Sequence, residues 1–528
     1  MEIPTFENEL TLARARRAGD EEAVHEAYEA AVAAVRARLG ETHPLRIGGE
    51  SLERAERFRA WSPGDLDTLV GEFAAGDAAT VDRAVDAARA AFDGWRRTPA
   101  DERARIFRDA ADLARERKFD LAAVVSLENG KGRAEALADV DEAIDFLSFY
   151  ARELERADGF VRDTGEPTPG EHCENVRRPY GVMAVVAPFN FPLAILAGMT
   201  TAAAIVGNTT VVKPASATPL VAHEFLDLLE SAGLPDGVVN LVTGGGRAVG
   251  APLVEHEGVS GVAFTGSRAV GREIQREFAT RSGPVVAELG GKNPVVVTET
   301  ADLDDATEGV ATGAFSFAGQ KCSATSRVYV AEARFDAFAE RLVAETESLA
   351  VSEPTERGAV VSPLIDDDAL DRYRRIVREA RNVGRVLTGG HVLETGLPDG
   401  RYVAPTVVAD VPHGHPLARE EQFVPFVTLH PVADLAEGIE RSNDSEYGLC
   451  AGLFSTDDAE IARWLDEVES GMCYVNRATS ATTGALVGAQ PFGGWKASGT
   501  TGTFAGGYTY LRQFTREQSR TVVGRAFP

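Results

Sequence analysis

A regular alternation of apolar runs and helical segments between residues 182 and 289 constrains the fold more than any other feature. The five apolar runs are Val182–Ala187, Thr210–Lys213, Val238–Val242, Gly261–Thr265 and Val285–Leu289. Buried strands separated by helices are typical of a parallel sheet covered by helices on both faces. A second alternating region spans about 294–475. The chain is therefore predicted to be an α/β protein with two doubly wound parallel-sheet domains.

The remaining segments add helices and short strands to this frame. At 528 residues the chain exceeds what one hydrophobic core supports, so two or three domains are expected. Residues 8–40 are helical in pattern, and Thr80–Trp95 carries apolar residues at the spacing of one helix face. Leu45–Gly49 and Leu69–Phe73 are predicted as short strands. The tail from Tyr508 to Val523 is predicted as a late strand after a glycine-rich loop.

No charged residue occurs from Gly181 to Val212, a length that would suffice for a membrane span. The stretch is interrupted by Pro188, Pro192 and Gly207, which favours a buried strand–loop–helix unit in a globular core. The first ten residues lack the basic and apolar regions of a signal peptide. We therefore expect no membrane partner.

The charge of the chain limits its partners. The net charge is −27, from 81 acidic and 54 basic residues, and the six lysines are at positions 118, 131, 213, 292, 321 and 496. An acidic, lysine-poor surface looks like halophilic adaptation; a merely acidic cytosolic protein is the alternative. Nucleic acid is not expected as a partner, because no basic face is available to neutralise phosphates.

The spacing of the cysteines argues against a metal site and against disulfide bonds. Cys173, Cys322, Cys450 and Cys473 show no CxxC pairing and no histidine-rich partner segment. Neither a metal site nor a disulfide framework is predicted. A reducing, cytoplasmic compartment is expected.

Cys322 and Glu288 are the candidate reactive pair. Cys322 is flanked by the small residues Gly319, Ser323 and Ala324, which leave room for a substrate to approach the sulfur. A lone cysteine is more often an inert core residue. Glu288 ends a strand-like run before two glycines and would reach into a cleft, although a simple strand-end acid is equally compatible. A thiolate beside a carboxylate suits attack on an aldehyde carbon.

Three further segments carry polar residues in unusual places. Asn190 lies between aromatic residues and prolines, where a buried amide needs a partner; it would either donate to an oxyanion or satisfy loop backbone groups. Lys213 ends a strand, where it would otherwise be a solvated surface residue. Gly266 and Ser267 occupy a strand–turn–helix start suited to a dinucleotide phosphate, or form a plain turn.

Taken together, these segments resemble the aldehyde dehydrogenase superfamily over about residues 45–520. The resemblance implies that Cys322 is the nucleophile that forms a thiohemiacetal, and that Glu288 activates water against the resulting thioester. Asn190 and the Cys322 backbone N–H would form the oxyanion hole. Five more positions match cofactor-binding residues of the family. Lys213 would bind a ribose, Ser267 with Gly266 the pyrophosphate, and Glu421 with its neighbour Phe423 the nicotinamide ribose. Val424 departs from the family, which usually has Gly there.

A finer resemblance concerns the substrate. Gly319–Ser323 and Thr483–Gly494 are similar to segments of dehydrogenases of L-glutamate γ-semialdehyde, the open form of 1-pyrroline-5-carboxylate. It implies that the substrate α-carboxylate is held by Ser323, Gly484 and Ala485, and that Phe191 and Phe492 wall its methylene chain. The implied reaction is oxidation to L-glutamate in proline and arginine catabolism. A succinate semialdehyde dehydrogenase and a non-catalytic protein on the same fold are the alternatives.

The resemblance also implies a cofactor and a domain division. Ser216 stands where strict NAD users often carry Glu, so NAD is expected with NADP accepted. The expected division is as follows: an N-terminal helical segment 1–45, a dinucleotide-binding domain 46–156 and 177–293, a catalytic domain 294–504, and a small β element of 157–176 and 505–528. Through this last element the chain is expected to form a homo-oligomer, a dimer or larger, with a small-molecule substrate as its other partner.

Overall fold

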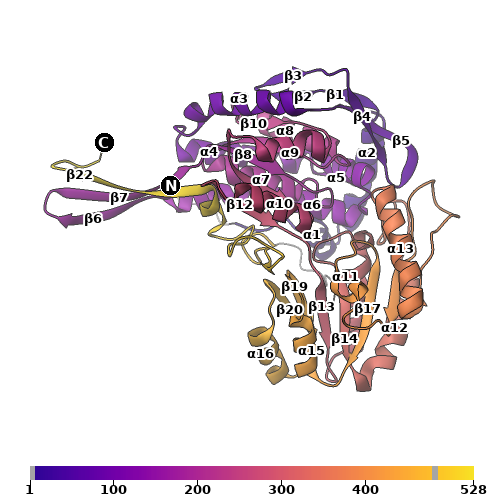
Figure 1. Cartoon of the computed structure of the whole chain (residues 1–528). Helices are drawn as coiled ribbons and strands as arrows, with labels where there is room; N and C mark the ends of the chain where they lie inside the picture. Colours follow the sequence, from indigo (N-terminus) through magenta and orange to yellow (C-terminus); the bar gives the residue numbers. More distant parts are fainter. Residues whose placement is uncertain (1–5, 479–485, 528) are drawn as a thin grey trace.

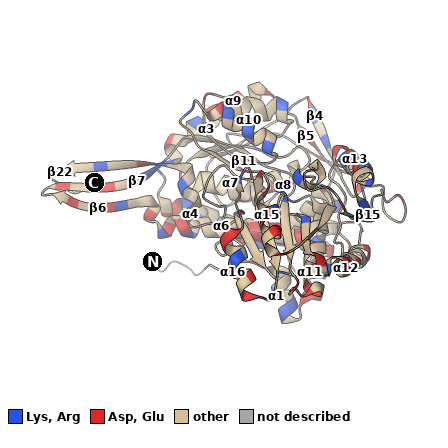
Figure 2. Cartoon of the chain, turned by 60° about the horizontal axis from the view of Figure 1, so that its bottom comes forward, with Lys and Arg blue, Asp and Glu red and all other residues tan. Residues whose placement is uncertain are grey.

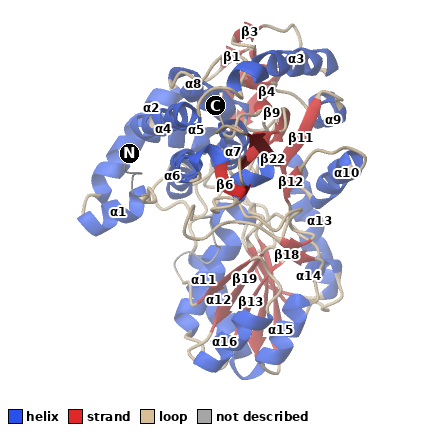
Figure 3. Ribbon diagram, turned by 90° about the vertical axis from the view of Figure 1, so that its left-hand side faces the viewer, coloured by secondary structure: helices blue, strands red, loops and turns tan. Residues whose placement is uncertain are grey.

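A computed structural model describes residues 6–478 and 486–527. Two seven-stranded sheets form the centres of an upper and a lower body, and a thin antiparallel ribbon projects sideways from the upper one (Figure 1). Helices cover the sheets of both bodies (Figure 3). This architecture confirms the prediction of an α/β fold with two doubly wound sheets.

The first sheet has the order β12-β11-β8-β9-β10-β2-β3. Its strands are β2 (Leu45–Ile47), β3 (Glu50–Leu52), β8 (Val182–Val186), β9 (Thr209–Lys213), β10 (Val239–Leu241), β11 (Val259–Thr265) and β12 (Val285–Glu288). The five from β12 to β10 are parallel, whereas β2 and β3 pair antiparallel. The chain leaves β8 toward β9 on one side and later returns to β11 on the other. The order therefore reverses beside β8, where α/β sheets form a ligand crevice at the carboxyl ends of the strands.

Alternate residues of β8 enter the two cores on either side of this sheet. Met183 and Val185 belong to one core, and Val182 and Ala184 to the other. This period of two explains why the run is apolar throughout. The helices of the body are α1 (Thr11–Ala18), α2 (Glu21–Arg36), α3 (Ala78–Trp95), α4 (Ala100–Glu116), α5 (Lys118–Asn129), α6 (Arg133–Arg156), α7 (Ala194–Ile205), α8 (Pro219–Ser231), α9 (Ala251–Glu255) and α10 (Arg268–Phe278).

The second sheet has the order β15-β16-β17-β14-β13-β19-β20, with β15 antiparallel to its neighbour and the rest parallel. Its strands are β13 (Asn293–Val297), β14 (Thr325–Ala331), β15 (Arg385–Thr388), β16 (Thr406–Ala409), β17 (Phe426–Val432), β19 (Cys450–Phe454) and β20 (Met472–Val475). Its helices are α11 (Leu303–Phe315), α12 (Phe335–Ser348), α13 (Asp367–Val383), α14 (Pro416–Arg419), α15 (Leu435–Asn443) and α16 (Asp458–Glu467). The chain passes from the first sheet to the second between Glu288 and Asn293.

Three smaller sheets complete the fold. The projecting ribbon consists of β6 (Val161–Thr168), β7 (Glu171–Pro179) and β22 (Thr515–Val523), all antiparallel. The other two are β1 (Glu41–His43) with β5 (Asp65–Ala74) and β4 (Arg57–Ser62), and β18 (Tyr447–Gly448) with β21 (Trp495–Lys496). The ribbon joins the two segments expected to form a small β element, although β7 runs three residues past its expected end.

Two expectations about elements need correction. The helical pattern of residues 8–40 forms two helices, because Gly19 ends α1 in a left-handed conformation with φ 78°. The tail is not extended throughout: Tyr510–Phe514 is a turn of 3-10 helix, and the strand begins at Thr515. Tyr510 and Phe514 are buried in the first core, which draws this segment into a compact turn. The domain division itself stays a prediction.

Candidate functional site

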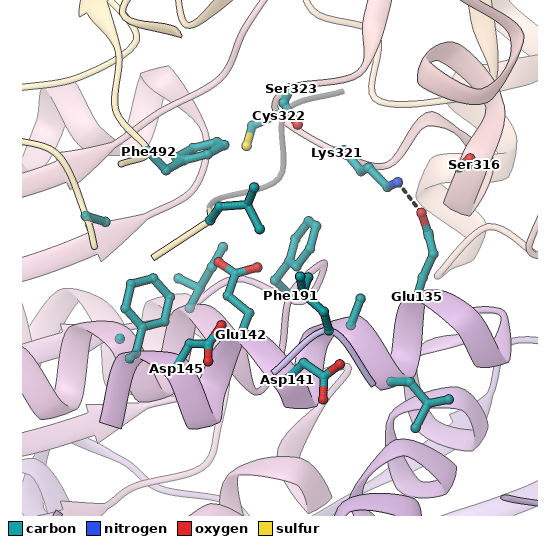
Figure 4. Close-up of a pocket in the computed structure, with 18 of the residues that line it drawn as sticks. Glu135, Asp141, Glu142, Asp145, Phe191, Ser316, Lys321, Cys322, Ser323 and Phe492 are labelled. Atoms are coloured by element: carbon teal, nitrogen blue, oxygen red, sulfur yellow. Dashed lines mark hydrogen bonds and ion pairs between the residues drawn. The ribbon is translucent and has the colours of Figure 1, made fainter. Parts of the chain in front are cut away.

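A cavity of about 390 Å³ lies between the two bodies and brings together several of the predicted residues. Cys322, Ser323, Glu288, Phe191 and Phe492 all line it. In Figure 4, Cys322 and Ser323 approach it from one side, and helix α6 forms the opposite wall. The candidate nucleophile, the candidate base and both aromatic walls therefore share one cavity.

The turn before Cys322 has an unusual backbone. Phe317, Ala318 and Gly319 all have positive φ, of 52°, 53° and 65°. Non-glycine residues avoid this region because Cβ crowds the backbone. At Gly319 an added Cβ would lie 2.6 Å from the carbonyl oxygen of Val424, so glycine is required there. The fully buried side chain of Phe317 helps to hold this strained turn in place.

The Asn293 side chain is hydrogen-bonded to the backbone of Cys322, and no sequence motif indicated this residue. Its Nδ2 donates to the carbonyl oxygens of Cys322, at 2.8 Å, and Ala324, at 2.9 Å. Its Oδ1 accepts a hydrogen bond from the Cys450 N–H at 3.1 Å. One buried amide thus ties the candidate nucleophile to the second sheet. The available signal was a polar residue at the start of an otherwise apolar strand.

Burial shapes the ionisation of both candidate reactive groups. It raises the pKa of the Cys322 thiol well above its usual range, and the nearby carboxyl groups of Glu421 and Glu288 raise it further. Burial also raises the pKa of Glu288 well above that of an ordinary carboxyl, although the Gly494 N–H opposes this by donating to the carboxylate. Its Oε2 is buried without a hydrogen-bond partner within the described chain. Because buried polar atoms are nearly always hydrogen-bonded, an unpaired oxygen on a residue that lines the cavity is a candidate acceptor for a bound molecule.

Asn190 lies in the loop after β8 and is 3% exposed. Asn129 Nδ2 donates to the carbonyl oxygen of the preceding residue, Phe189. The loop therefore leaves β8 at the crevice where the strand order reverses and is tied down from the side of α5. Asn190 is not among the described residues that line the cavity, so its role as an oxyanion donor stays a prediction.

The residues expected to bind the cofactor lie at the carboxyl ends of β9 and β11. Lys213 is 5% exposed, and its Nζ donates to the Pro214 carbonyl oxygen at 2.6 Å. Burial lowers the pKa of Lys213 to about 8. Ser216 Oγ donates to the Gly244 carbonyl oxygen at 3.0 Å. Gly266 leads into Ser267, the N-cap of α10, whose Oγ accepts a weak hydrogen bond from the Val270 N–H.

Glu421 and Phe423 follow α14 on the second body. Glu421 Oε1 accepts a hydrogen bond from the Gly291 N–H at 3.0 Å. Burial raises the pKa of Glu421 to about 7. The Phe423 backbone has a positive φ of 56°, and its ring packs edge-on against Phe189, with 5.8 Å between the centroids. Val424 is buried in the second core, so its side chain is accommodated by packing.

The expected carboxylate-binding residues are only partly described. Ser323 is 4% exposed and lines the cavity. Gly484 and Ala485 lie outside the described residues.

One wall of the cavity carries charged residues that the sequence did not reveal. Helix α6 contributes Glu135, Asp141, Glu142 and Asp145. Glu135 pairs with Lys321, the residue before Cys322, as the dashed line in Figure 4 marks. The second oxygen of Glu135 is buried without a hydrogen-bond partner among the described residues. The scarcity of lysines was the one sequence signal for Lys321, whereas Glu135 looked like any other helical acid.

Within residues 6–478 and 486–527, no cluster of His, Cys, Asp and Glu has an arrangement that would hold a metal ion. No helix in the same ranges is long and apolar enough to cross a membrane.

Comparisons with known proteins agree with this geometry. The family model "Aldehyde dehydrogenase family" matches residues 51–519. The chain is 40% identical, over 494 residues, to a Bacillus subtilis (strain 168) protein named 1-pyrroline-5-carboxylate dehydrogenase 2, covering 92% of this chain and 94% of that protein.

Solved structures of related proteins are also similar to this chain. A 1-pyrroline-5-carboxylate dehydrogenase from Thermus with bound NAD superposes with a TM-score of 0.91 at 37% identity, covering 99% of this chain and all of that one. Proline utilization A (PutA) from Bdellovibrio bacteriovorus reaches a TM-score of 0.93 at 36% identity. In that case the match covers 99% of this chain and 54% of the longer protein.

Proposed function

Because the chain belongs to the aldehyde dehydrogenase family, we propose that it oxidises L-glutamate 5-semialdehyde, formed from 1-pyrroline-5-carboxylate, to L-glutamate with NAD(P). This reaction belongs to proline and arginine catabolism. One observation carries the proposal: the thiol of Cys322, the carboxyl group of Glu288 and the aromatic rings of Phe191 and Phe492 line a single cavity. The relatives named above as 1-pyrroline-5-carboxylate dehydrogenases support the choice of substrate.

The first half of the reaction forms a covalent intermediate. The Cys322 thiol loses its proton to water, and the sulfur attacks the aldehyde carbon to give a thiohemiacetal. Asn190 Nδ2 and the Cys322 backbone N–H donate to the oxyanion that forms on the former carbonyl oxygen. Such a donor contributes roughly 2.7–4 kcal/mol, and alignment of the reactants contributes roughly 7–11 kcal/mol at best.

The second half releases the product. A bound nicotinamide supplies the hydride acceptor, and loss of hydride from the thiohemiacetal carbon leaves a thioester on Cys322. Glu288 then takes a proton from a water molecule, whose oxygen attacks the thioester carbon. The C–S bond breaks, the carboxylic acid leaves, and the sulfur regains a proton. The unpaired Oε2 of Glu288 supports this role, because it is free to accept from that water.

The donors at the carboxyl ends of the strands fit a dinucleotide. Lys213 Nζ uses one of its three hydrogens on Pro214 and retains others for ribose hydroxyls. The N–H groups at the start of α10, next to Gly266 and Ser267, suit a pyrophosphate. Glu421, with Phe423 beside it, would accept from the nicotinamide ribose. Uncharged Ser216 would not repel a 2′-phosphate, so we expect NAD to work best and NADP to be accepted.

The charged ends of the substrate also have candidate partners. Ser323, with Gly484 and Ala485, would hold the α-carboxylate through a hydroxyl and backbone N–H groups. The buried, unpaired oxygen of Glu135 would accept from the α-ammonium group. Succinate semialdehyde has no ammonium group, so this oxygen favours the amino acid semialdehyde.

A substrate and cofactor panel at high KCl tests the proposal. Purified protein should form NADH with 1-pyrroline-5-carboxylate much faster than with succinate semialdehyde, and Cys322→Ala should abolish the reaction. Cys473→Ala is the matched control, because that partly exposed cysteine is absent from the cavity. Faster turnover of succinate semialdehyde would overturn the substrate, and full activity of Cys322→Ala would overturn the mechanism. Protein without any aldehyde-dependent activity would indicate a non-catalytic role.

A further inference from the structure

A buried lysine lies directly behind the substrate-facing wall of the cavity. Lys131 is in the short connection between α5 and α6 and is completely buried. Its Nζ lies 2.9 Å from Asp139 Oδ2, and both side chains of this pair are shielded from solvent. The same Nζ lies 3.5 Å from the centroid of the Phe191 ring. Phe191 in turn lines the cavity.

The Lys131–Asp139 pair also connects the two loops that carry the proposed chemistry. Lys131 Nζ also lies 5.3 Å from the ring centroid of Phe317, in the strained turn before Cys322. Asp139 Oδ1 accepts a hydrogen bond from the Ala194 N–H at 2.7 Å, at the start of α7. The pair therefore contacts the loop from β8 to α7 at two points and the cysteine turn at a third.

Stability alone does not account for such a pair. Removing two charges from water is costly, and buried ion pairs are often replaced by apolar residues without loss of stability. By contrast, a cation over an aromatic face fixes the orientation of the ring and is worth more where water is excluded. Phe191 is one of two rings expected to flank the substrate chain, so a small rotation would change the width of that channel.

We propose that Lys131, held by Asp139, is a positioning residue. It fixes the Phe191 ring against the substrate chain and holds the Asn190 loop in its position relative to the Cys322 turn. The residue touches neither substrate nor cofactor and acts through the two phenylalanine rings. This inference rests on the proposed function for the identity of the substrate, but the contacts of Lys131 do not depend on it.

The test compares a long with a short aldehyde. Lys131→Met keeps the length of the side chain and removes its charge. Its kcat/KM for glutamate semialdehyde should fall about tenfold, the loss expected when a desolvated cation–π contact is removed, mainly through a higher KM. Propanal is too short to lie along both rings, so its kcat/KM should change much less. Lys131→Arg keeps a cation over the ring and should restore much of the selectivity.

Two controls separate positioning from general damage. Arg103→Met removes a similarly buried cation that donates to the carbonyl oxygens of Thr98 and Ile205 and does not line the cavity, so it should leave the ratio of the two aldehydes unchanged. If Lys131→Met does not fold, the double variant with Asp139→Asn avoids an unpaired buried charge and retains an acceptor for Ala194. The ratio is then measured in that variant.

The outcomes distinguish this inference from the proposed function. An unchanged ratio of the two aldehydes in Lys131→Met or the double variant would overturn the positioning role, even with lower thermal stability. A wild-type protein that ignored glutamate semialdehyde but oxidised another long aldehyde would overturn the substrate instead. The ratio would then be measured with that aldehyde.

Discussion

At the scale of single residues, the site places two acidic groups where water is scarce. Burial raises the pKa values of both Cys322 and Glu288 and so favours the protonated form of each. A protonated carboxyl group beside a thiol is a resting state in which neither the nucleophile nor the base is active. Binding of substrate and cofactor must change these surroundings before the reaction begins.

Glu288→Gln should separate the two halves of the reaction. Gln has the same shape but cannot take a proton from water, so the thioester should form and then accumulate. We expect one equivalent of NADH per active site, followed by steady turnover reduced by ~10²–10⁴-fold, in stopped-flow absorbance measurements. Glu142→Gln changes another cavity carboxyl and should leave the steady rate nearly intact. Loss of the initial burst would show that Glu288 acts before hydride transfer.

Ser216→Glu should narrow the cofactor preference. A carboxylate at this position would accept from a ribose 2′-hydroxyl and repel a 2′-phosphate. We expect kcat/KM with NADP to fall at least about tenfold, equivalent to about 1.4 kcal/mol, with little change for NAD. Ser216→Gln is the neutral control of similar size and should affect both cofactors alike. An unchanged NADP rate in Ser216→Glu would remove this residue from cofactor selection.

At the scale of elements, several helices depend on side chains remote in sequence. Helix α8 has no side-chain cap of its own, and Pro219 stands in its first turn. Glu128, from α5, instead accepts from the N–H groups of Leu220 and Val221, at 2.6 and 2.9 Å. The start of α8 is therefore satisfied by a fully buried carboxyl group, which links two helices of the first body.

Glu128 should make the stability of the protein depend on pH. Burial raises its pKa to about 8, while the two N–H donors oppose this rise. Between about pH 4.5 and pH 8 the folded protein then holds a proton that the unfolded chain releases, so this contribution to stability falls as pH rises. Glu128→Gln removes the titration but keeps an acceptor, and its unfolding free energy should decline less over this range in denaturant titrations.

Glu128→Ala is the matched comparison. It leaves both N–H donors without their acceptor and should cost roughly 1–3 kcal/mol at every pH. If wild type and Glu128→Gln showed the same pH dependence, the carboxyl group would be ionised throughout the range.

At the scale of the whole molecule, the excess of acidic residues is the main electrostatic feature. Acidic residues recur over both bodies and along the projecting ribbon in Figure 2, interspersed with Lys and Arg. The net charge of −27 is large for one chain, and self-repulsion of this kind destabilises a compact state. The halophilic and cytoplasmic expectations and the homo-oligomer formed through β6, β7 and β22 remain predictions at this scale.

Salt should therefore stabilise the protein. Raising KCl from about 0.1 M to about 1 M shortens the screening length from roughly 10 Å to about 3 Å and weakens the repulsion. We expect Tm and aldehyde-dependent activity to rise together over this range, and activity to be lost on dialysis to low salt. Sucrose at equal osmolality controls for general exclusion effects. A constant Tm and full activity at low salt would contradict the halophilic interpretation.

The strand–helix alternation from Val182 to Glu288 was predictable, because the periods of strands and helices are local properties of the sequence. The motifs around Cys322 and Lys213 were equally visible. The turn at Tyr510–Phe514 was not, since burial against the first core decided its conformation. Contacts between distant residues were also hidden: Asn293 with Cys322, Glu135 with Lys321, and Lys131 with the rings of Phe191 and Phe317.

The sequence by itself thus determined the class of fold, through local periodicities, and indicated the candidate reactive groups, through short motifs. Only the tertiary structure decided how those groups are surrounded. The pKa values of Cys322 and Glu288, the unpaired oxygen of Glu135 and the burial of Lys131 all arise where the two bodies meet. Electrostatics and packing act through space, so no periodicity along the chain records them.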